Sequence, residues 1–287
     1  MIPRAVAYMV VSALGFSAMS LLVKVASESL PTGEIVLARA VVTLVVSYAM
    51  VRRAGLPPWG TNKVGLAFRG LLGFTGLTLY YLSLAHLPLA DATTIHQTIP
   101  LLTSVIAWFI LRERIGWATA FALACGIAGV TLIVHPTGTG LEPIGIAAGI
   151  GAALSGSMAY VTVRQLARTE NALVIVFYFP LIAMPLAIPW AIATWVTPEP
   201  LEWLLLFAIG LTTQVGQVFL TKALVIETAS RATSIGYIQV AFAMIWQWTV
   251  FSAPPTMYTV AGAALIILGT VAVARASRSA TRSDTPA

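Results

Sequence analysis

Long apolar stretches, separated by short polar turns, recur along the whole chain. A helix that crosses the hydrocarbon core of a bilayer needs roughly 20 mostly apolar residues. The pattern predicts about ten such spans, at residues 5–25, 33–51, 65–86, 90–111, 117–135, 144–165, 171–194, 201–222, 229–251 and 257–275. The turns are rich in proline and glycine, and none is long enough for a soluble domain. The chain is therefore predicted to be an all-α membrane protein of ten transmembrane helices.

Composition agrees with a lipid environment. Hydrophobic residues make up 59% of the 287 residues and charged residues 9%, which leaves too little polar surface for a water-soluble fold. The first apolar stretch is too long for a signal peptide and has no convincing cleavage site before Pro31, so we interpret it as the first span. The single cysteine, Cys125, lies inside a predicted span and is expected to pack there as a free thiol.

The net charge of +6 could indicate a nucleic-acid partner, but the positions of the basic residues indicate membrane topology instead. Most of the 16 Lys and Arg residues, Arg69 among them, lie near span ends on one side of the alternating path, and only Lys24 and Arg39 fall toward the other side. By the positive-inside rule both termini are cytoplasmic. We expect a multi-pass protein of the inner (plasma) membrane with the bilayer, and no nucleic acid, as its partner.

Internal similarity divides the chain into two halves. It is carried by three pairs of segments: residues 13–24 with 153–164, residues 90–98 with 229–237, and Gly129 with Gly269. The predicted units are a first five-helix repeat at 1–138, a second at 139–276, and a polar cytoplasmic tail at 277–287. Because five is odd, the second repeat is inverted in the membrane, as in transporters that work by alternating access around a midplane site.

Several short motifs resemble the EamA-type members of the drug/metabolite transporter superfamily, in particular its amino-acid exporters. They are residues 79–85 (LYYLSLA), 90–92 (ADA), Pro100, 111–113 (LRE), the Gly126/Gly129 pair and the position of Arg39 in the first half, and 229–232 (ASRA) and 262–269 in the second. One departure is that Ala253 stands where the first half has Glu113. The resemblance implies a ten-helix basket, with helices 5 and 10 at the back and a central cavity formed by helices 1–4 and 6–9.

No enzyme motif is present. The sequence lacks a nucleotide-binding loop, an HExxH pair and a Cys/His cluster with metal spacing, and His86, His96 and His135 are widely separated. We therefore predict no enzymatic activity, no cofactor and no metal. All ten acidic residues lie at span ends or in loops, which argues against proton-coupled export of organic cations through a buried carboxylate.

Uncharged polar and aromatic side chains occupy the helices that the resemblance places around the cavity. The predicted substrate-binding residues are Ser17, Tyr80, Tyr81, His96, Gln97, Tyr160, Gln214, Gln217, Tyr237, Gln239 and Trp246. Aromatic faces, amides and hydroxyls can hold a small organic solute, but each can also join two helices by a hydrogen bond. Trp195 is expected in the interfacial aromatic belt.

Arg39, His96 and Pro100 are candidates for gating or coupling. Arg39 is interpreted as the only cation more than a turn inside a span, which disfavours strongly anionic substrates; alternatively it snorkels to the headgroups or pairs with Glu34 or Asp91. Pro100 has no N–H and therefore frees the carbonyl of His96. This carbonyl and the His96 imidazole could contact a substrate, the imidazole could take up a proton, or a neighbouring Ser or Thr could satisfy the carbonyl at a kink.

These observations together predict a secondary transporter that exports small organic metabolites by alternating access. The resemblance favours amino acids, aromatic or bulky and neutral, as substrates. A permease for another neutral metabolite or drug is one alternative, and a non-transporting membrane receptor or scaffold is another. The oligomeric state is left open, and a monomer is compatible with the sequence.

Overall fold

Helices account for the regular structure of this protein. The computed structural model describes residues 4–86, 95–96, 98–112, 116–134, 142–251 and 257–283, and these residues contain no strand. The helices are α1 (Arg4–Ala26), α2 (Thr32–Arg53), α3 (Lys63–His86), α5 (Ile99–Leu111), α6 (Trp117–Val134), α7 (Pro143–Leu166), α8 (Ala172–Ala193), α9 (Pro200–Ile226), α10 (Ala229–Ile235), α11 (Ile238–Phe251) and α12 (Met257–Ser283).

Helix starts coincide with residues that suit them. Pro143 and Pro200 occupy the first turns of α7 and α9, where the missing N–H has no helical partner to lose. The Asn171 side chain accepts a hydrogen bond from Leu173 N at the start of α8. Among the described residues, α1, α2, α7, α8 and α9 are long and apolar enough to cross a membrane; the predicted total of ten spans stays a prediction.

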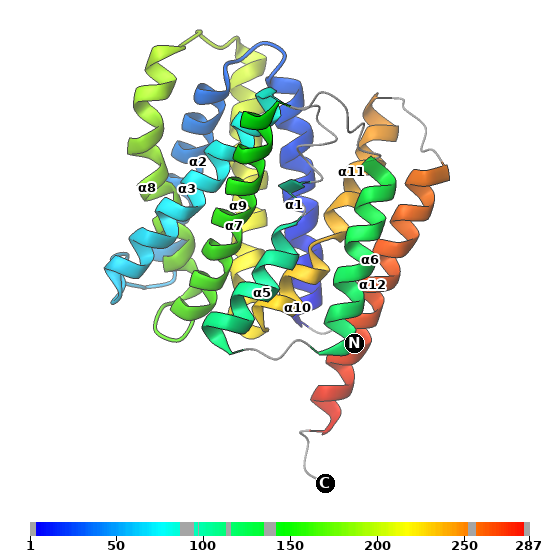
Figure 1. The fold of residues 1–287 in the computed structure, drawn as a ribbon. Coiled ribbons are helices and arrows are strands. Elements are labelled where there is room, and N and C mark those ends of the chain that lie inside the picture. Colours follow the sequence, from blue (N-terminus) through cyan, green and yellow to red (C-terminus); the bar gives the residue numbers. More distant parts are fainter. Residues whose placement is uncertain are drawn as a thin grey trace.

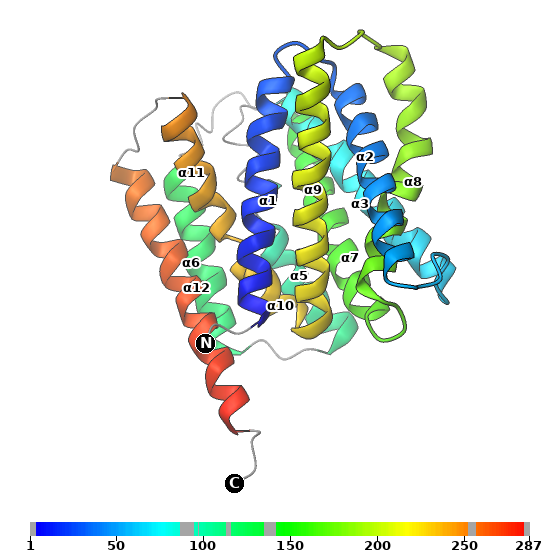
Figure 2. The same ribbon diagram turned by 180° about the vertical axis from the view of Figure 1, so that it is seen from behind.

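The two halves of the chain interleave. Figures 1 and 2 show α1 beside α9, and α6 beside α12 at one edge of the bundle. The other main pairs are α3 with α7 and α2 with α8. Each pair joins a helix of the first half to one of the second. In the internal repeat α1 corresponds to α7 and α3 to α9, so the α1/α9 pair and the α7/α3 pair are equivalent. This arrangement fits the inverted repeat that the sequence predicts.

Small residues permit the closest of these approaches. A Cβ atom on Gly15 would lie 2.9 Å from the backbone nitrogen of Gly216, where α1 meets α9. One on Gly76 would lie 3.3 Å from the backbone nitrogen of Gly156, at the corresponding contact of α3 with α7. Helices in membranes associate through such small-residue contacts because lipid supplies little hydrophobic driving force between them.

The helix expected at 90–111 is interrupted, which corrects the prediction of one continuous span. Residues 95–96 are helical, Thr98 precedes α5, and Pro100 lies in the first turn of α5. Proline is favoured in a first turn and disfavoured in a helix interior. The stretch expected at 229–251 is divided in the same way, because α10 ends at Ile235 and α11 begins at Ile238.

The start of α1 and the end of α12 lie at the same end of the molecule (Figure 1). The end of α2, the start of α3 and the ends of α5 and α7 lie there too, so this end carries Arg53, Lys63, Arg112 and Arg168. We call it the basic end. The positive-inside rule predicts that it faces the cytoplasm.

Candidate substrate-binding site

Two arginines are buried in the interior of the bundle. Arg39 of α2 is 4% exposed and Arg69 of α3 is 2% exposed. Both guanidinium groups lie over one aromatic ring, that of Phe179 on α8: the Arg69 Cζ atom is 4.9 Å and the Arg39 Cζ atom 5.5 Å from the ring centroid. Such contacts attract a cation to the ring face, so Phe179 holds both charges near each other.

Polar groups from the second half of the chain complete this cluster. Arg69 Nη2 donates a hydrogen bond of 3.0 Å to Gln217 Oε1 on α9. Tyr160 of α7 lies near Arg69, and Tyr81 of α3 lies beside Arg39. The cluster therefore draws on α2, α3, α7, α8 and α9, and both halves contribute to it.

Acidic residues of the described part of the chain do not pair with the charges of the cluster. Within the described part of the chain, no carboxylate forms an ion pair with Arg39 or Arg69. Arg69 Nε and Nη1 are buried, and neither has a hydrogen-bond partner. A buried donor without an acceptor is costly, so the arrangement is prepared to donate hydrogen bonds to a ligand.

The position of Arg69 corrects the sequence interpretation, which placed it with the topology-setting residues at a span end. Because α3 begins at Lys63, Arg69 lies nearly two turns inside the helix. Gly73 leaves room for the Phe179 ring, because a Cβ atom on residue 73 would lie only 2.7 Å from a ring carbon. The run of glycines on α3 next to Arg69 is the sequence feature that could have indicated that this side chain lies deep in the bundle.

The structure argues against two of the alternatives proposed for Arg39. It is buried, so it does not snorkel, and its expected partner Glu34 instead accepts a 3.2 Å hydrogen bond from Val196 N. The other expected partner, Asp91, lies outside the described residues, as does Gln97.

Other predicted site residues lie in two further groups. Tyr80 stacks on His96 with ring centroids 4.0 Å apart, and His96 Nδ1 is buried without a partner. The Thr98 hydroxyl donates to Ile95 O at 2.6 Å next to this stack. On α1 and α9, Ser17 Oγ and Gln214 Oε1 are buried without partners, and Gln214 Nε2 contacts Met50 Sδ at 3.7 Å.

Tyr237, Gln239 and Trp246 are not joined to the arginines by any described contact. Tyr237 lies at the break between α10 and α11, and its ring fills the space beside Gly126 of α6, where a Cβ would clash with it. Gln239 N donates to Gly236 O at 3.0 Å, and Trp246 Nε1 is buried without a partner. Of these three residues, Tyr237 packs where the break between α10 and α11 meets α6.

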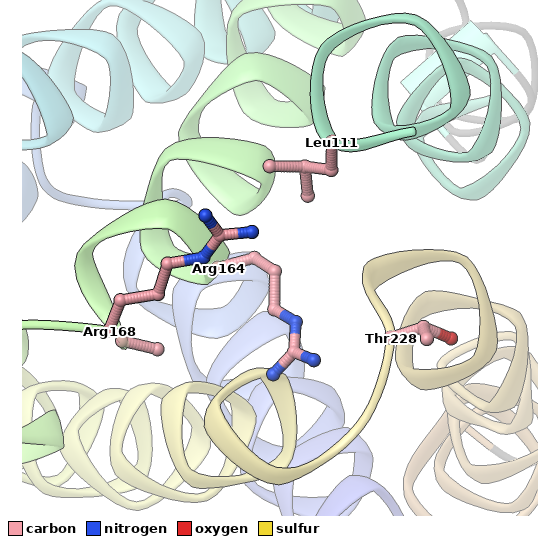
Figure 3. Close-up of a pocket in the computed structure, with 5 residues that line it drawn as sticks. Leu111, Arg164, Arg168 and Thr228 are labelled. Atoms are coloured by element: carbon pink, nitrogen blue, oxygen red, sulfur yellow. The ribbon is translucent and has the colours of Figure 1, made fainter. Parts of the chain in front are cut away.

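A separate cavity of about 210 Å³ opens at the basic end (Figure 3). Leu111 of α5, Ala167 and Arg168 at the end of α7, Arg164 and Thr228 line it. Arg164 Nη1 donates to the last carbonyls of α9, with 2.7 Å to Val225 O. The cavity therefore lies where helices of both halves end together, beneath the interrupted helices.

The fold is that of a helical membrane protein in which both halves of the chain contribute to one buried polar cluster. The chain belongs to the EamA-like transporter family, whose model matches residues 3–135 and again residues 143–275. It is thus a multi-pass, membrane-embedded member of a transporter family, and the suspected resemblance is confirmed.

Known relatives carry small metabolites. The chain is 34% identical over 270 residues to the pseudopaline exporter CntI of Pseudomonas aeruginosa (strain UCBPP-PA14), which covers 94% of this chain and 95% of that protein. It is 31% identical over 203 residues to the S-adenosylmethionine uptake transporter of Rickettsia prowazekii (strain Madrid E), covering 71% and 69%. A crystal structure with 22% identity superposes with a TM-score of 0.77 over 96% of this chain and 99% of the other, which supports the fold.

Proposed function

We propose that this protein is a secondary transporter of the inner membrane that exports small amino-acid-type metabolites by alternating access. The observation that carries this proposal is the composition of the buried cluster: Arg39 and Arg69 come from the first half, and Phe179 and Gln217 from the second. A site shared by two inverted repeats changes its access when one repeat rocks against the other.

Export is the direction best supported. The relative that matches nearly the full length of both chains is named an exporter, whereas the uptake transporter matches a smaller share. With the basic end in the cytoplasm, the 210 Å³ cavity at that end would be the entry for a substrate leaving the cell.

The substrate proposal keeps the amino-acid character and drops the restriction to neutral molecules. Strongly anionic substrates were disfavoured because Arg39 was taken as the single deep cation, and the resemblance then favoured aromatic or bulky neutral amino acids. With Arg69 also buried, that reason no longer holds, while a carboxylate remains a group that arginine recognises well.

Reconstitution in liposomes tests the proposal. Proteoliposomes loaded with one unlabelled amino acid at a time are assayed for counterflow of the same radiolabelled amino acid, with and without a pH gradient. We expect counterflow of at least one amino acid above protein-free liposomes. Transport of neutral drugs alone would favour the permease alternative, and no transport of any tested solute would favour a receptor or scaffold.

A further inference from the structure

We infer that Arg39 and Arg69 together bind a substrate that carries two carboxylate groups. This inference rests on the proposed transport function and assigns the chemical class of its substrate. The pair is buried among helices of both halves, and no acidic side chain of the described residues accompanies it.

Charge balance is the first argument. Two guanidinium groups over the same ring repel each other in a medium of low dielectric constant, and each loses most of its hydration. A zwitterionic amino acid adds no net charge and leaves both positive charges uncompensated. A ligand with two carboxylates places one negative group against each cation. Even where it also carries an ammonium group, as glutamate does, it adds one net negative charge that its amide analogue lacks, so the site favours it over a zwitterion of the same size.

Geometry is the second argument. Gln217 and the Phe179 ring fix the Arg69 guanidinium in place, while its Nε and Nη1 atoms retain free N–H donors inside the protein. Arginine donors held in a fixed plane recognise carboxylate oxygens with strong, charge-assisted hydrogen bonds. Tyr81 beside Arg39 and Tyr160 near Arg69 can add hydroxyl donors to the two carboxylates.

Burial determines when binding occurs. With 4% and 2% of their surface exposed, the arginines are closed off from both ends of the molecule in this conformation. The ligand reaches them only when the two halves separate, and its charge then offsets the repulsion as they close again. Burial of the two arginine charges makes the closed, empty site unfavourable. Because a bound ligand offsets this cost, occupancy of the site is coupled to closure.

The experiment compares matched pairs of ligands on the purified full-length protein. Glutamate and glutamine have nearly the same shape but differ by one carboxylate, as do aspartate and asparagine. Thermal unfolding in detergent is followed with each compound, and counterflow of each is measured in proteoliposomes. We expect the dicarboxylates to raise the midpoint temperature and to exchange with at least about tenfold higher apparent affinity than the amides.

Three variants test the residues, and a fourth serves as their control. Arg39→Gln and Arg69→Gln should abolish the preference for dicarboxylates, and Arg69→Lys should retain part of it. Arg53→Gln, at the exposed basic end, is the control because it also removes one positive charge but lies outside the cluster. Because no acidic side chain of the described residues compensates the wild-type charges without ligand, both glutamine variants should unfold at the same temperature as the ligand-free wild type or higher. If the arginines only hold helices together, these variants unfold at lower temperature instead.

The outcomes separate this inference from the transport proposal. Counterflow of neutral amino acids without any dicarboxylate preference, unchanged in the arginine variants, overturns the two-carboxylate site but leaves the transporter. A midpoint shift by glutamate that the arginine variants lose, without counterflow of any compound, supports the site and overturns transport. A wild type that responds to neither member of each pair overturns the inference.

Discussion

Single residues in the interior divide into those near the buried arginines and those that fill helix junctions. Tyr160 lies near Arg69, whereas Tyr237 is 1% exposed and packs on Gly126. Although both were predicted to bind substrate, their surroundings differ. Contact with a charged cluster suits a ligand site, and tight apolar packing suits stability.

The two tyrosines should therefore respond differently to truncation. Tyr237→Ala removes a buried ring, and we expect a loss of stability of about 3 kcal/mol or more. Tyr160→Ala should lower counterflow roughly fivefold, corresponding to about 1 kcal/mol of lost binding, with the midpoint temperature close to that of the wild type. Trp195, which is 48% exposed, is the control, and Trp195→Ala should change neither quantity. Equal effects of both tyrosine variants on both measurements would remove the distinction.

Glu170, in the turn between α7 and α8, connects this turn to the segment before α3 at the basic end. Its Oε1 atom accepts hydrogen bonds from Thr61 N at 2.7 Å, from Thr61 Oγ1 at 2.6 Å and from Asn62 N, just before α3. Burial by itself raises the pKa of the Glu170 carboxyl, but these hydrogen bonds outweigh burial and the resulting pKa lies below its ordinary value.

A lowered pKa in the folded state makes the stability from Glu170 depend on pH. This contribution is fully present above the unfolded pKa of about 4.3 and is lost as the pH falls through the lower folded pKa. Glu170→Gln should destabilise the protein by about 1 to 3 kcal/mol at neutral pH, and the difference from wild type should shrink in acid.

Thermal midpoints of wild type and Glu170→Gln, measured from about pH 7 down to about pH 3, check this expectation. Glu28→Gln, in the exposed turn after α1, controls for the loss of one carboxylate. A difference between wild type and Glu170→Gln that grows as the pH falls would contradict the assigned sign.

Between elements, glycines set how closely the two halves pack. A Cβ on Gly129 of α6 would lie 2.6 Å from the Gly262 carbonyl oxygen of α12, and one on Gly269 would lie 3.1 Å from Ala122 Cα. The neighbours are backbone atoms, which cannot swing aside as a side chain can. These positions are the ones that the internal repeat aligns, Gly129 with Gly269.

Gly129→Ala should accordingly destabilise the α6/α12 pair. Alanine gains up to about 1 kcal/mol of helix propensity over glycine, but forced separation of two packed helices costs about 1 to 3 kcal/mol, so we expect a net loss. Gly116→Ala, where a Cβ would meet nothing within 4 Å, is the matched control. Detergent melting curves of the two variants decide the matter: a Gly129→Ala midpoint at or above that of wild type would show that the contact is loose.

The elements were more predictable than the site. Apolar stretches of membrane length and the two-half similarity follow from local pattern. The resemblance placed helices 5 and 10 at the back of the bundle, and these are the contacting helices α6 and α12. The interruption at Thr98 was missed because Pro100 was taken to bend one helix, whereas it begins another. The depth of Arg69 was missed because it depends on where α3 begins and on the contact with Phe179 of α8. The residue pattern along one helix contains neither piece of information.

For the molecule as a whole, contacts at both ends tie each half to the other. At the basic end Glu170 of the second half accepts from Thr61 of the first, and at the opposite end the Ser29 hydroxyl donates to Glu202 near the start of α9. These paired contacts fix α3 to the α7–α8 turn and α9 to the α1–α2 turn. The 210 Å³ cavity at the basic end is lined by residues of α5, of α7 and its end, and by Thr228 just before α10, and we expect opening toward the arginines to begin there.

Accessibility of that cavity tests both orientation and alternating access. Cys125 is the only native cysteine, so a Cys125→Ala background allows a single thiol to be placed at Ala167, which lines the cavity. A membrane-impermeant thiol reagent should modify Ala167→Cys in inside-out vesicles and not in right-side-out ones, because the basic end is predicted to be cytoplasmic. Saturating amino acid that supports counterflow should slow the reaction several-fold as closed conformations are populated. Ala54→Cys, exposed at the same end beside α2, should react from the same side at a rate that substrate does not alter. Modification from the outer face would reverse the predicted orientation, and equal slowing at both positions would mean that the substrate does not act through the cavity.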